Sequence, residues 1–280
     1  MMELAEEAEM IFVDQELAHR LETVQDERGA QYVYAQQRLE PDGDSGVLSV
    51  AGGRVLYAGA GLPVDRATGL GMNGPVTQDE LVTVEAFYRD HGLPSRVDLC
   101  PLAHPTLFDL LQADYRIDTF FSVLFCPLPI EAVTDGLTSE IRVSLAKPEE
   151  ANLWIRTTAQ GFTEMEDPPV ADLRILTPNF TSEDGQCFFA WVDGQPAGGG
   201  GMYVHAGVAE FGGASTRMAY RNRGVQIALL RHRLEAAAAA GCDLAMVMSE
   251  PGSGSHRNAE RVGFRVAYTK AVMVRPLTLP

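Results

Sequence analysis

The 280-residue sequence has no run of eighteen consecutive apolar residues, so no helix spanning a bilayer is expected. Basic residues are scarce, because 22 lysines and arginines stand against 38 aspartates and glutamates, a formal net charge of −16 at pH 7. Nucleic acid binds to basic surfaces, so it is excluded as the expected partner. The acidic excess serves solubility, and it also suits a cationic acceptor such as an amine. The first residues, MMELAEEAEMIF, are acidic where a signal peptide is basic, which predicts a cytoplasmic protein.

Metal-binding motifs are also lacking. The four cysteines lie far apart and form no C-x-x-C pair, and the six histidines show neither an H-x-x-x-H nor an H-E-x-x-H spacing. We therefore expect free, buried thiols and no metal centre. An apolar content of 46% with 21% charged residues is typical of a globular protein, and the length is sufficient for two domains.

The most informative stretch is residues 214–241, ASTRMAYRNRGVQIALLRHRLEAAAAAG, which reads as the end of a strand, a basic turn and a helix that ends at Gly241. The first backbone N–H groups of a helix have no carbonyl partner, so they form an anion site. Arg221 and Arg223 add permanently charged donors, and Gly224 allows a ligand to approach the backbone closely. The pattern predicts that this turn binds a diphosphate.

The residues that follow make the interpretation more specific. Residues 242–249 (CDLAMVMS) are typical of a buried strand; after Glu250 come a small-residue turn, a short helix and a strand that begins at Gly263-Phe264. This order, from about Glu140 onward, resembles the acetyl-coenzyme A binding core of the GCN5-related N-acetyltransferases (GNAT). The resemblance implies that acetyl-CoA is the co-substrate. The residues that it implies for coenzyme binding are Thr216, Met218, Arg221, Asn222, Arg223, Gly224, Val225, Gln226, Ser255 and Asn258.

The resemblance also implies catalytic groups. A glutamate removes the proton of the attacking amine in many members, and Glu210 and Glu250 are the candidates here, with His205 as a third. Many members protonate the leaving thiolate with a tyrosine, but the corresponding position in this sequence is Ala259. Either the thiolate leaves unaided, or another side chain substitutes for the tyrosine. The candidate substitutes are Ser255, His256 and Tyr268.

The order of elements recurs within the chain. Gly92 and Asp114 align with Gly241 and Gly263 at one offset (241 − 92 = 149 and 263 − 114 = 149), and YRIDTFFSV then lies over FRVAYTKAV. We therefore expect an α/β protein of two tandem GNAT-like domains, each a mixed twisted sheet flanked by helices. The predicted ranges are 1–130 and 139–280.

Only the second copy is expected to bind the coenzyme. In the first copy, the sequence from Gly74 to Thr77 contains no arginine and leads into Asp79 and Glu80, whose carboxylates would repel a diphosphate. A second glycine-rich stretch, Gly198–Gly201, lacks the helix and lysine of a nucleotide-binding loop. There we expect a strand that packs closely against its neighbours.

The expected function is the transfer of an acetyl group from acetyl-CoA to an amine of a small molecule or peptide, by direct attack. The alternatives are a catalytically weak CoA-binding sensor and an enzyme that uses another acyl group or a carrier-protein thioester. The sequence leaves the acceptor and the oligomeric state open.

Overall fold

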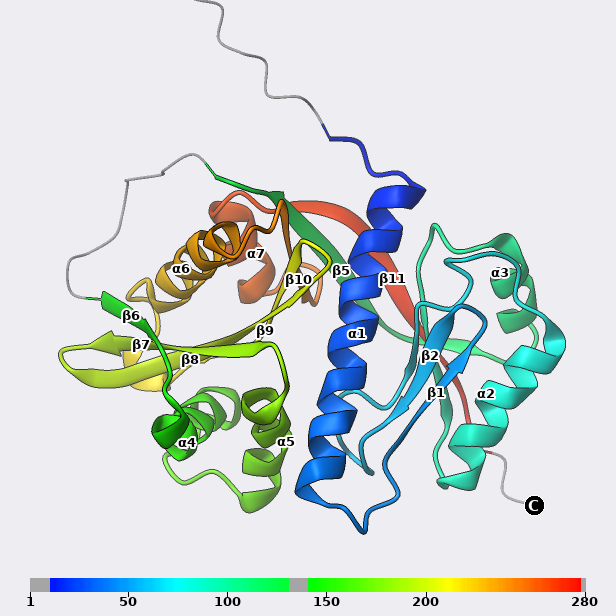
Figure 1. Ribbon diagram of the computed structural model, residues 1–280, viewed down its shortest axis with the longest axis horizontal. Helices are drawn as coiled ribbons and strands as arrows, with labels where there is room; N and C mark the ends of the chain where they lie inside the picture. Colours follow the sequence, from blue (N-terminus) through cyan, green and yellow to red (C-terminus); the bar gives the residue numbers. More distant parts are fainter. Residues whose placement is uncertain (1–10, 131–140, 278–280) are drawn as a thin grey trace, which may run out of the picture.

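A computed structural model describes residues 11–130 and 141–277 of the chain (Figure 1). Its helices are α1 (Gln15–Leu39), α2 (Gln78–Asp90), α3 (Pro105–Leu111), α4 (Ala151–Thr163), α5 (Val170–Thr181), α6 (Val225–Ala239) and α7 (Gly254–Arg261), with short 3₁₀ turns at Pro148–Glu150 and Met218–Tyr220. Its strands are β1 (Gly46–Val50), β2 (Gly53–Tyr57), β3 (Ala67–Thr68), β4 (Ser95–Leu99), β5 (Arg116–Pro127), β6 (Ile141–Leu145), β7 (Gly185–Val192), β8 (Gln195–His205), β9 (Val208–Thr216), β10 (Leu244–Ser249) and β11 (Arg265–Arg275). The prediction of an α/β fold with mixed sheets and flanking helices is confirmed.

The strands form one continuous sheet in the order β1-β2-β3-β4-β11-β5-β10-β9-β8-β7-β6. In this order the last strand of the second half, β11, lies between β4 and β5 of the first half and pairs antiparallel with both. In return, β5 lies between β11 and β10 of the second half. The two halves are therefore joined by exchanged strands, which the sequence did not indicate. The predicted boundary falls mostly at residues 131–140, outside the described residues, so the domain limits stay a prediction.

The internal duplication is visible in the starts of the elements. The offset is the same for β4 and β10 (244 − 95 = 149), for α3 and α7 (254 − 105 = 149) and for β5 and β11 (265 − 116 = 149). In the central pair, Arg116 faces Val274 and Phe125 faces Arg265, and 274 − 125 is again 149. The two strands are thus related by an approximate twofold axis that passes between them.

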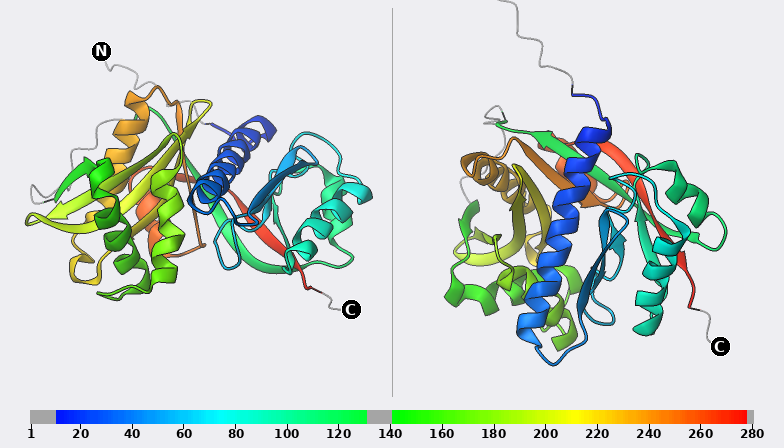
Figure 2. Two further views of the ribbon diagram at one scale, coloured as in Figure 1. Left: turned by 60° about the horizontal axis from the view of Figure 1, so that its bottom comes forward. Right: turned by 45° about the vertical axis from the view of Figure 1, so that its right-hand side comes forward.

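Helix α1 connects the two halves. Its N-cap is Asp14, whose side chain accepts a hydrogen bond from the Leu17 N–H at 2.9 Å. Leu17 and Leu21 pack into the core of the first half. On the second half, the Tyr32 hydroxyl donates to the Ile175 carbonyl of α5 at 2.8 Å. Figure 1 and Figure 2 show α1 lying across the middle of the molecule, so this helix of the first half packs against the second half.

In the second half, helices cover both faces of the sheet. Helices α4 and α5 pack on one face of β7, β8 and β9, whereas α6 packs on the other face, with α7 beside it (Figure 1). The glycine tract at Gly198–Gly201 lies in β8 between these layers. A Cβ at Gly198 would lie 2.5 Å from the Ser215 carbonyl oxygen, and one at Gly199 would lie 2.4 Å from Thr158 Oγ1. The tract therefore allows close packing on both faces, as predicted.

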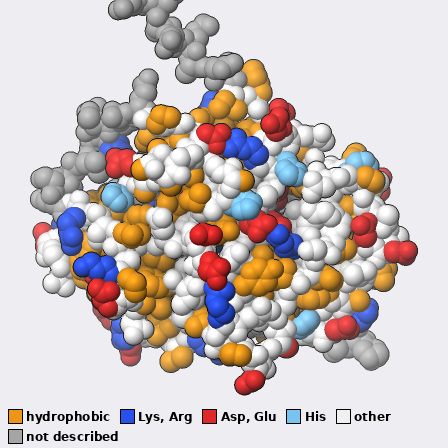
Figure 3. All heavy atoms as spheres, in the orientation of Figure 1, with side chains coloured by type: hydrophobic (Ala, Val, Ile, Leu, Met, Phe, Trp, Pro, Cys, Tyr) orange, Lys and Arg blue, Asp and Glu red, His pale blue; other side chains and the backbone are white. Residues whose placement is uncertain are grey.

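The charged side chains on the face of the molecule drawn in Figure 3 agree with the small number of basic residues in the composition. Acidic and basic side chains are interspersed there, and the basic ones form no continuous area. Among the described helices, none combines the length and the apolar character needed to cross a membrane.

Candidate active site

The site lies where two parallel strands diverge. β9 and β10 pair in parallel from Val208 opposite Leu244 to Phe211 opposite Val247, and the pairing stops there. Beyond this point β9 contains an irregularity beside Gly212, where Gly213 has a positive φ of 56°. The residues that follow in β9 have no partner on the β10 side, so their backbone groups are available to a ligand.

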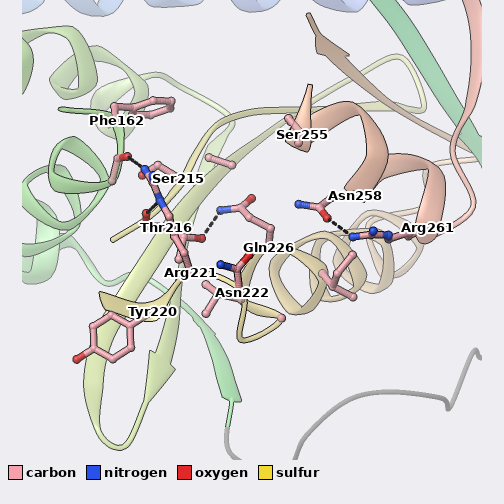
Figure 4. A pocket seen from close by; sticks show the side chains of 16 residues that line it. Phe162, Ser215, Thr216, Tyr220, Arg221, Asn222, Gln226, Ser255, Asn258 and Arg261 are labelled. Carbon is pink, nitrogen blue, oxygen red and sulfur yellow. Dashed lines mark hydrogen bonds between the residues drawn. The ribbon is translucent and has the colours of Figure 1, made fainter. Parts of the chain in front are cut away.

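A cavity of about 620 Å³ opens at this divergence, between the end of β9, the start of α6, the end of α4 and α7 (Figure 4). It brings together eight of the ten predicted coenzyme residues, namely Thr216, Arg221, Asn222, Gly224, Val225, Gln226, Ser255 and Asn258. In Figure 4, Gln226 lies beside Thr216, and its side chain donates to Thr216 Oγ1 at 2.9 Å. Opposite them, Asn258 accepts a hydrogen bond from Arg261 at 3.3 Å.

The start of α6 forms one wall of this cavity. Its N-cap is Gly224, in the left-handed conformation with φ 86°, and no side chain caps the helix. The preceding Asn222 also has a positive φ, 61°. Uncapped N–H groups and the helix dipole favour a bound anion.

Arg221 borders the cavity but is already engaged. Its Nη1 lies 2.6 Å from Glu164 Oε1, and its Nη2 donates to the Gly161 carbonyl at 3.0 Å. This places the guanidinium at the end of α4, facing the start of α6. A diphosphate would compete with Glu164 for the same donors.

The structure places the remaining predicted coenzyme residues elsewhere. Arg223 does not line the cavity; it pairs with Asp193 at 3.3 Å and lies over the ring of Tyr220. Met218 was expected among the coenzyme residues, but β9 ends at Thr216, and Met218 begins a 3₁₀ turn with 57% of its surface exposed. Met218 therefore has no strand backbone to offer a pantetheine.

A second cavity, of about 320 Å³, continues the first between the diverging strands and shares Phe162, Gln226 and Asn258 with it. Leu230 of α6 and Phe162 of α4 both line it. Because α6 and α4 cover opposite faces of the sheet, this cavity passes from one face to the other. Glu250, which is exposed, borders it. Ala259, at the position of the missing tyrosine, borders it as well, together with Ser255.

Glu210 lies on β9 just before the strands diverge. The neighbouring Phe211 packs on the side of α6, so Glu210 faces the opposite side, where its Oε1 lies 3.5 Å from Arg28 Nη1 of α1. Only 3% of Glu210 is exposed, and its Oε2 has no hydrogen-bond partner among the described residues. Burial raises the pKa of Glu210, although Arg28 and Lys270 oppose the shift.

Three other catalytic candidates lie away from these cavities. The Tyr268 hydroxyl donates to Glu22 at 2.7 Å within the buried contact between α1 and β11, and burial raises the pKa of Tyr268 well above its ordinary value. His205 pairs with Val208 at the opposite end of β9, and the His256 ring lies 3.6 Å from Glu260. Of the proposed substitutes for the tyrosine, the structure brings Ser255 to the cavities but neither His256 nor Tyr268.

A third cavity, of about 390 Å³, lies between the two halves and shares Phe162 and Gly213 with the second. Arg28, Tyr32 and Arg66 line it from the first half. These residues were missed because no local motif in the sequence marks them. Arg28 and Tyr32 reach the cavity because α1 packs across both halves, and Arg66 reaches it from the segment before β3. Phe162 and Arg261 were missed as well, although Arg261 lies one helical turn after Asn258 and could have been inferred.

The corresponding helix start in the first half is closed. Thr77 caps α2 by accepting from the Glu80 N–H at 3.3 Å, while Glu80 Oε2 accepts from the Thr77 N–H at 2.8 Å. The carboxylate of Glu80 thus occupies the place at the start of α2 that a phosphate would take. Among the described residues, no group of three or more metal-ligating side chains is found.

A segment of the second half carries the pattern of a family of acyltransferases, enzymes that take an acyl group from an acyl-coenzyme A. Residues 151–264 match the acetyltransferase (GNAT) family, so the chain carries a domain of that family in its second half.

Solved structures extend the likeness to nearly the whole chain. A GCN5-related N-acetyltransferase from Kribbella flavida is 17% identical with a TM-score of 0.67, covering 93% of this chain and 96% of its own. A tandem GNAT protein from the clavulanic acid biosynthesis pathway is 13% identical with a TM-score of 0.56, covering 91% and 96%. A GCN5-related N-acetyltransferase from Sphaerobacter thermophilus is 16% identical with a TM-score of 0.52, covering 67% and 61%. At these identities the likeness concerns the fold. The comparison with curated proteins gave no match.

Proposed function

We propose that the protein is an N-acetyltransferase that moves an acetyl group from acetyl-CoA to an amine of a small molecule or peptide. The observation that carries this proposal is the continuity of the three cavities through the gap between β9 and β10. One end is an open helix start suited to a diphosphate, and the other is a separate chamber against α1. A thioester threaded through the gap would meet an acceptor bound in that chamber.

The first cavity would bind the diphosphate and pantetheine parts of the coenzyme. The backbone N–H groups at the start of α6, with Gly224 as N-cap, and the side chain of Arg221 would hold the diphosphate. The pantetheine would run along Ser215 and Thr216, whose outer backbone groups are unpaired by β10. The irregular part of β9 near Gly213 is then the place where a backbone N–H can polarise the thioester carbonyl.

Glu210 is the proposed base. In the reaction the amine nitrogen attacks the thioester carbonyl carbon, the C–S bond breaks, and the proton from the amine passes to the base while CoA leaves as thiolate. Arg28, the ion-pair partner of Glu210, lines the third cavity, and burial raises the pKa of Glu210 above its ordinary value, the direction that strengthens a carboxylate base. Glu250 borders the second cavity and is the alternative.

The experiment compares binding with turnover. Acetyl-CoA affinity is measured by calorimetry, and release of free CoA is followed with a panel of amines. We expect amine-dependent release of CoA, and a lower rate with unchanged coenzyme affinity for Glu210→Gln. Glu235→Gln, an exposed substitution on α6 outside the cavities, is the matched control.

A CoA-binding sensor is the second candidate, and the observation that favours it is Ala259 at the tyrosine position. Bound acetyl-CoA without turnover of any amine above thioester hydrolysis would establish the sensor and reject the enzyme.

A further inference from the structure

We infer that the acceptor carries a carboxylate as well as an amine, and that Arg28 and Arg66 of the first half bind this carboxylate in the third cavity. The inference rests on the proposed acetyltransferase function. It assigns the acceptor to the chemical class of amino acids and related small molecules.

The charge of the third cavity points to an anionic group. Its lining contains the cations Arg28 and Arg66 and one carboxylate, Asp172, in a protein whose net charge is −16. A pocket for a simple amine is expected to present an excess of carboxylates to the ammonium group. The volume of about 390 Å³ suits a small molecule.

Both arginines keep donors for a ligand. A guanidinium has five N–H donors. Among the described residues, Arg28 meets Glu210 at 3.5 Å and Asn179 at 3.2 Å. Within the described ranges, the Arg66 guanidinium makes one ion pair, a long contact with Asp98 at 3.6 Å, and it lies over the ring of Phe121. Side-chain exposure is 27% for Arg28 and 20% for Arg66, so each guanidinium is accessible yet partly shielded from water, where a carboxylate contact is strong.

Arg28 also connects the cavity to the proposed base. Its Nη1 is the ion-pair partner of Glu210 Oε1, while the second oxygen of Glu210 has no hydrogen-bond partner among the described residues. A molecule that places its carboxylate on Arg28 and Arg66 therefore holds a nearby amine on the side of Glu210. Only a few bonds can then separate the carboxylate and the amine of the acceptor, as in an amino acid.

The arrangement gives the first half a role. Its own helix start is closed by Thr77 and Glu80, but its α1 and the residues before β3 reach the acceptor chamber. The copy without a coenzyme site thus contributes recognition of the acceptor.

The test compares matched acceptors. Rates are measured for an amino acid, leucine, and for isoamylamine, which is leucine without its carboxylate. They are also measured for leucinamide, in which an amide replaces the carboxylate, and for phosphoethanolamine. We expect kcat/KM to be at least tenfold higher for the carboxylated member of a pair. A preference for phosphoethanolamine would show that the arginines bind phosphate and would overturn the carboxylate assignment.

Variants test whether Arg28 and Arg66 cause the preference for the carboxylated acceptor. Arg28→Gln and Arg66→Gln should each lower the ratio of kcat/KM for leucine to kcat/KM for isoamylamine at least tenfold and leave the affinity for acetyl-CoA unchanged. Because Arg28 pairs with Glu210, Arg28→Gln also changes the rate with isoamylamine, and the ratio removes this shared effect. Arg28→Lys keeps the charge and should restore part of the preference. Arg38→Gln, on the same helix but outside the cavity, is the control.

The outcomes separate the two proposals. Equal rates for leucine and isoamylamine, or an unchanged leucine-to-isoamylamine ratio of kcat/KM in both Arg28→Gln and Arg66→Gln, would overturn the carboxylate site while the acetyltransferase function stands. Bound acetyl-CoA without turnover of any amine would overturn the proposed function and this inference with it. Thermal unfolding of each variant shows whether a loss comes from misfolding.

Discussion

Replacing Arg221 tests the coenzyme site most directly. In Arg221→Glu, a donor at the rim of the first cavity becomes a carboxylate that faces Glu164, which already lies 2.6 Å from Arg221. Loss of a charge-assisted hydrogen bond costs about 1.5–3 kcal/mol. The exposed pair with Glu164, which the diphosphate must displace, offsets this by up to about 1 kcal/mol. Repulsion between the new carboxylate and a phosphate adds about 1 kcal/mol even in water.

The expected result is at least tenfold weaker binding of acetyl-CoA, about 1.4 kcal/mol or more. Calorimetry at fixed salt measures it. Arg89→Glu makes the same change of net charge at an exposed position of α2 in the other half, and it should leave the affinity unchanged. Acetyl-pantetheine, which has no diphosphate, should bind both variants and the wild type equally. Equal losses in Arg221→Glu and Arg89→Glu, or a parallel loss for acetyl-pantetheine, would refute the assignment of the diphosphate to the start of α6.

Further predictions concern the neighbours of this site. Glu164→Gln removes the ion pair that competes for Arg221, so acetyl-CoA should bind about two- to fivefold more tightly, and weaker binding would mean that Glu164 orients the arginine. Gly198→Ala should lower the free energy of unfolding in urea by about 1–3 kcal/mol or more because of its clash with the Ser215 carbonyl. The control Gly254→Ala, with open space around its Cβ, should change it by less than about 0.5 kcal/mol, and equal effects would contradict the close packing of the tract. Burial raises the pKa of Glu210 above 4.5, so the unfolded chain loses this proton first and wild-type stability falls as the pH rises through that value. Glu210→Gln lacks this loss, so its stability relative to wild type should increase from pH 4 to pH 7, and a difference independent of pH would show that folding does not shift the pKa of Glu210.

Much of the second half could be predicted because its signals are local. The open start of α6 depends on Gly224 and the residues beside it, and the hairpin between β7 and β8 depends on Asp193 and Gly194, both of which have positive φ. The offset of 149 predicted equivalent elements correctly, since each helix and strand is specified by its own pattern of apolar residues. The prediction failed at Met218, where the chain leaves the strand after Thr216 and no residue type marks the change.

The tertiary structure decided what joins the two halves. Pairing of β5 with β11 brings together residues that are between 140 (265 − 125) and 158 (274 − 116) positions apart, and a strand's pattern of side chains does not state which strand will lie beside it. The third cavity depends on α1 crossing to α5, where Arg28 meets Asn179 and Glu210 from more than a hundred residues away. The sequence alone therefore determined the open helix start of the second half, because this is a short-range property of the backbone. The long-range packing of α1 and the exchanged strands determined which side chains line the third cavity.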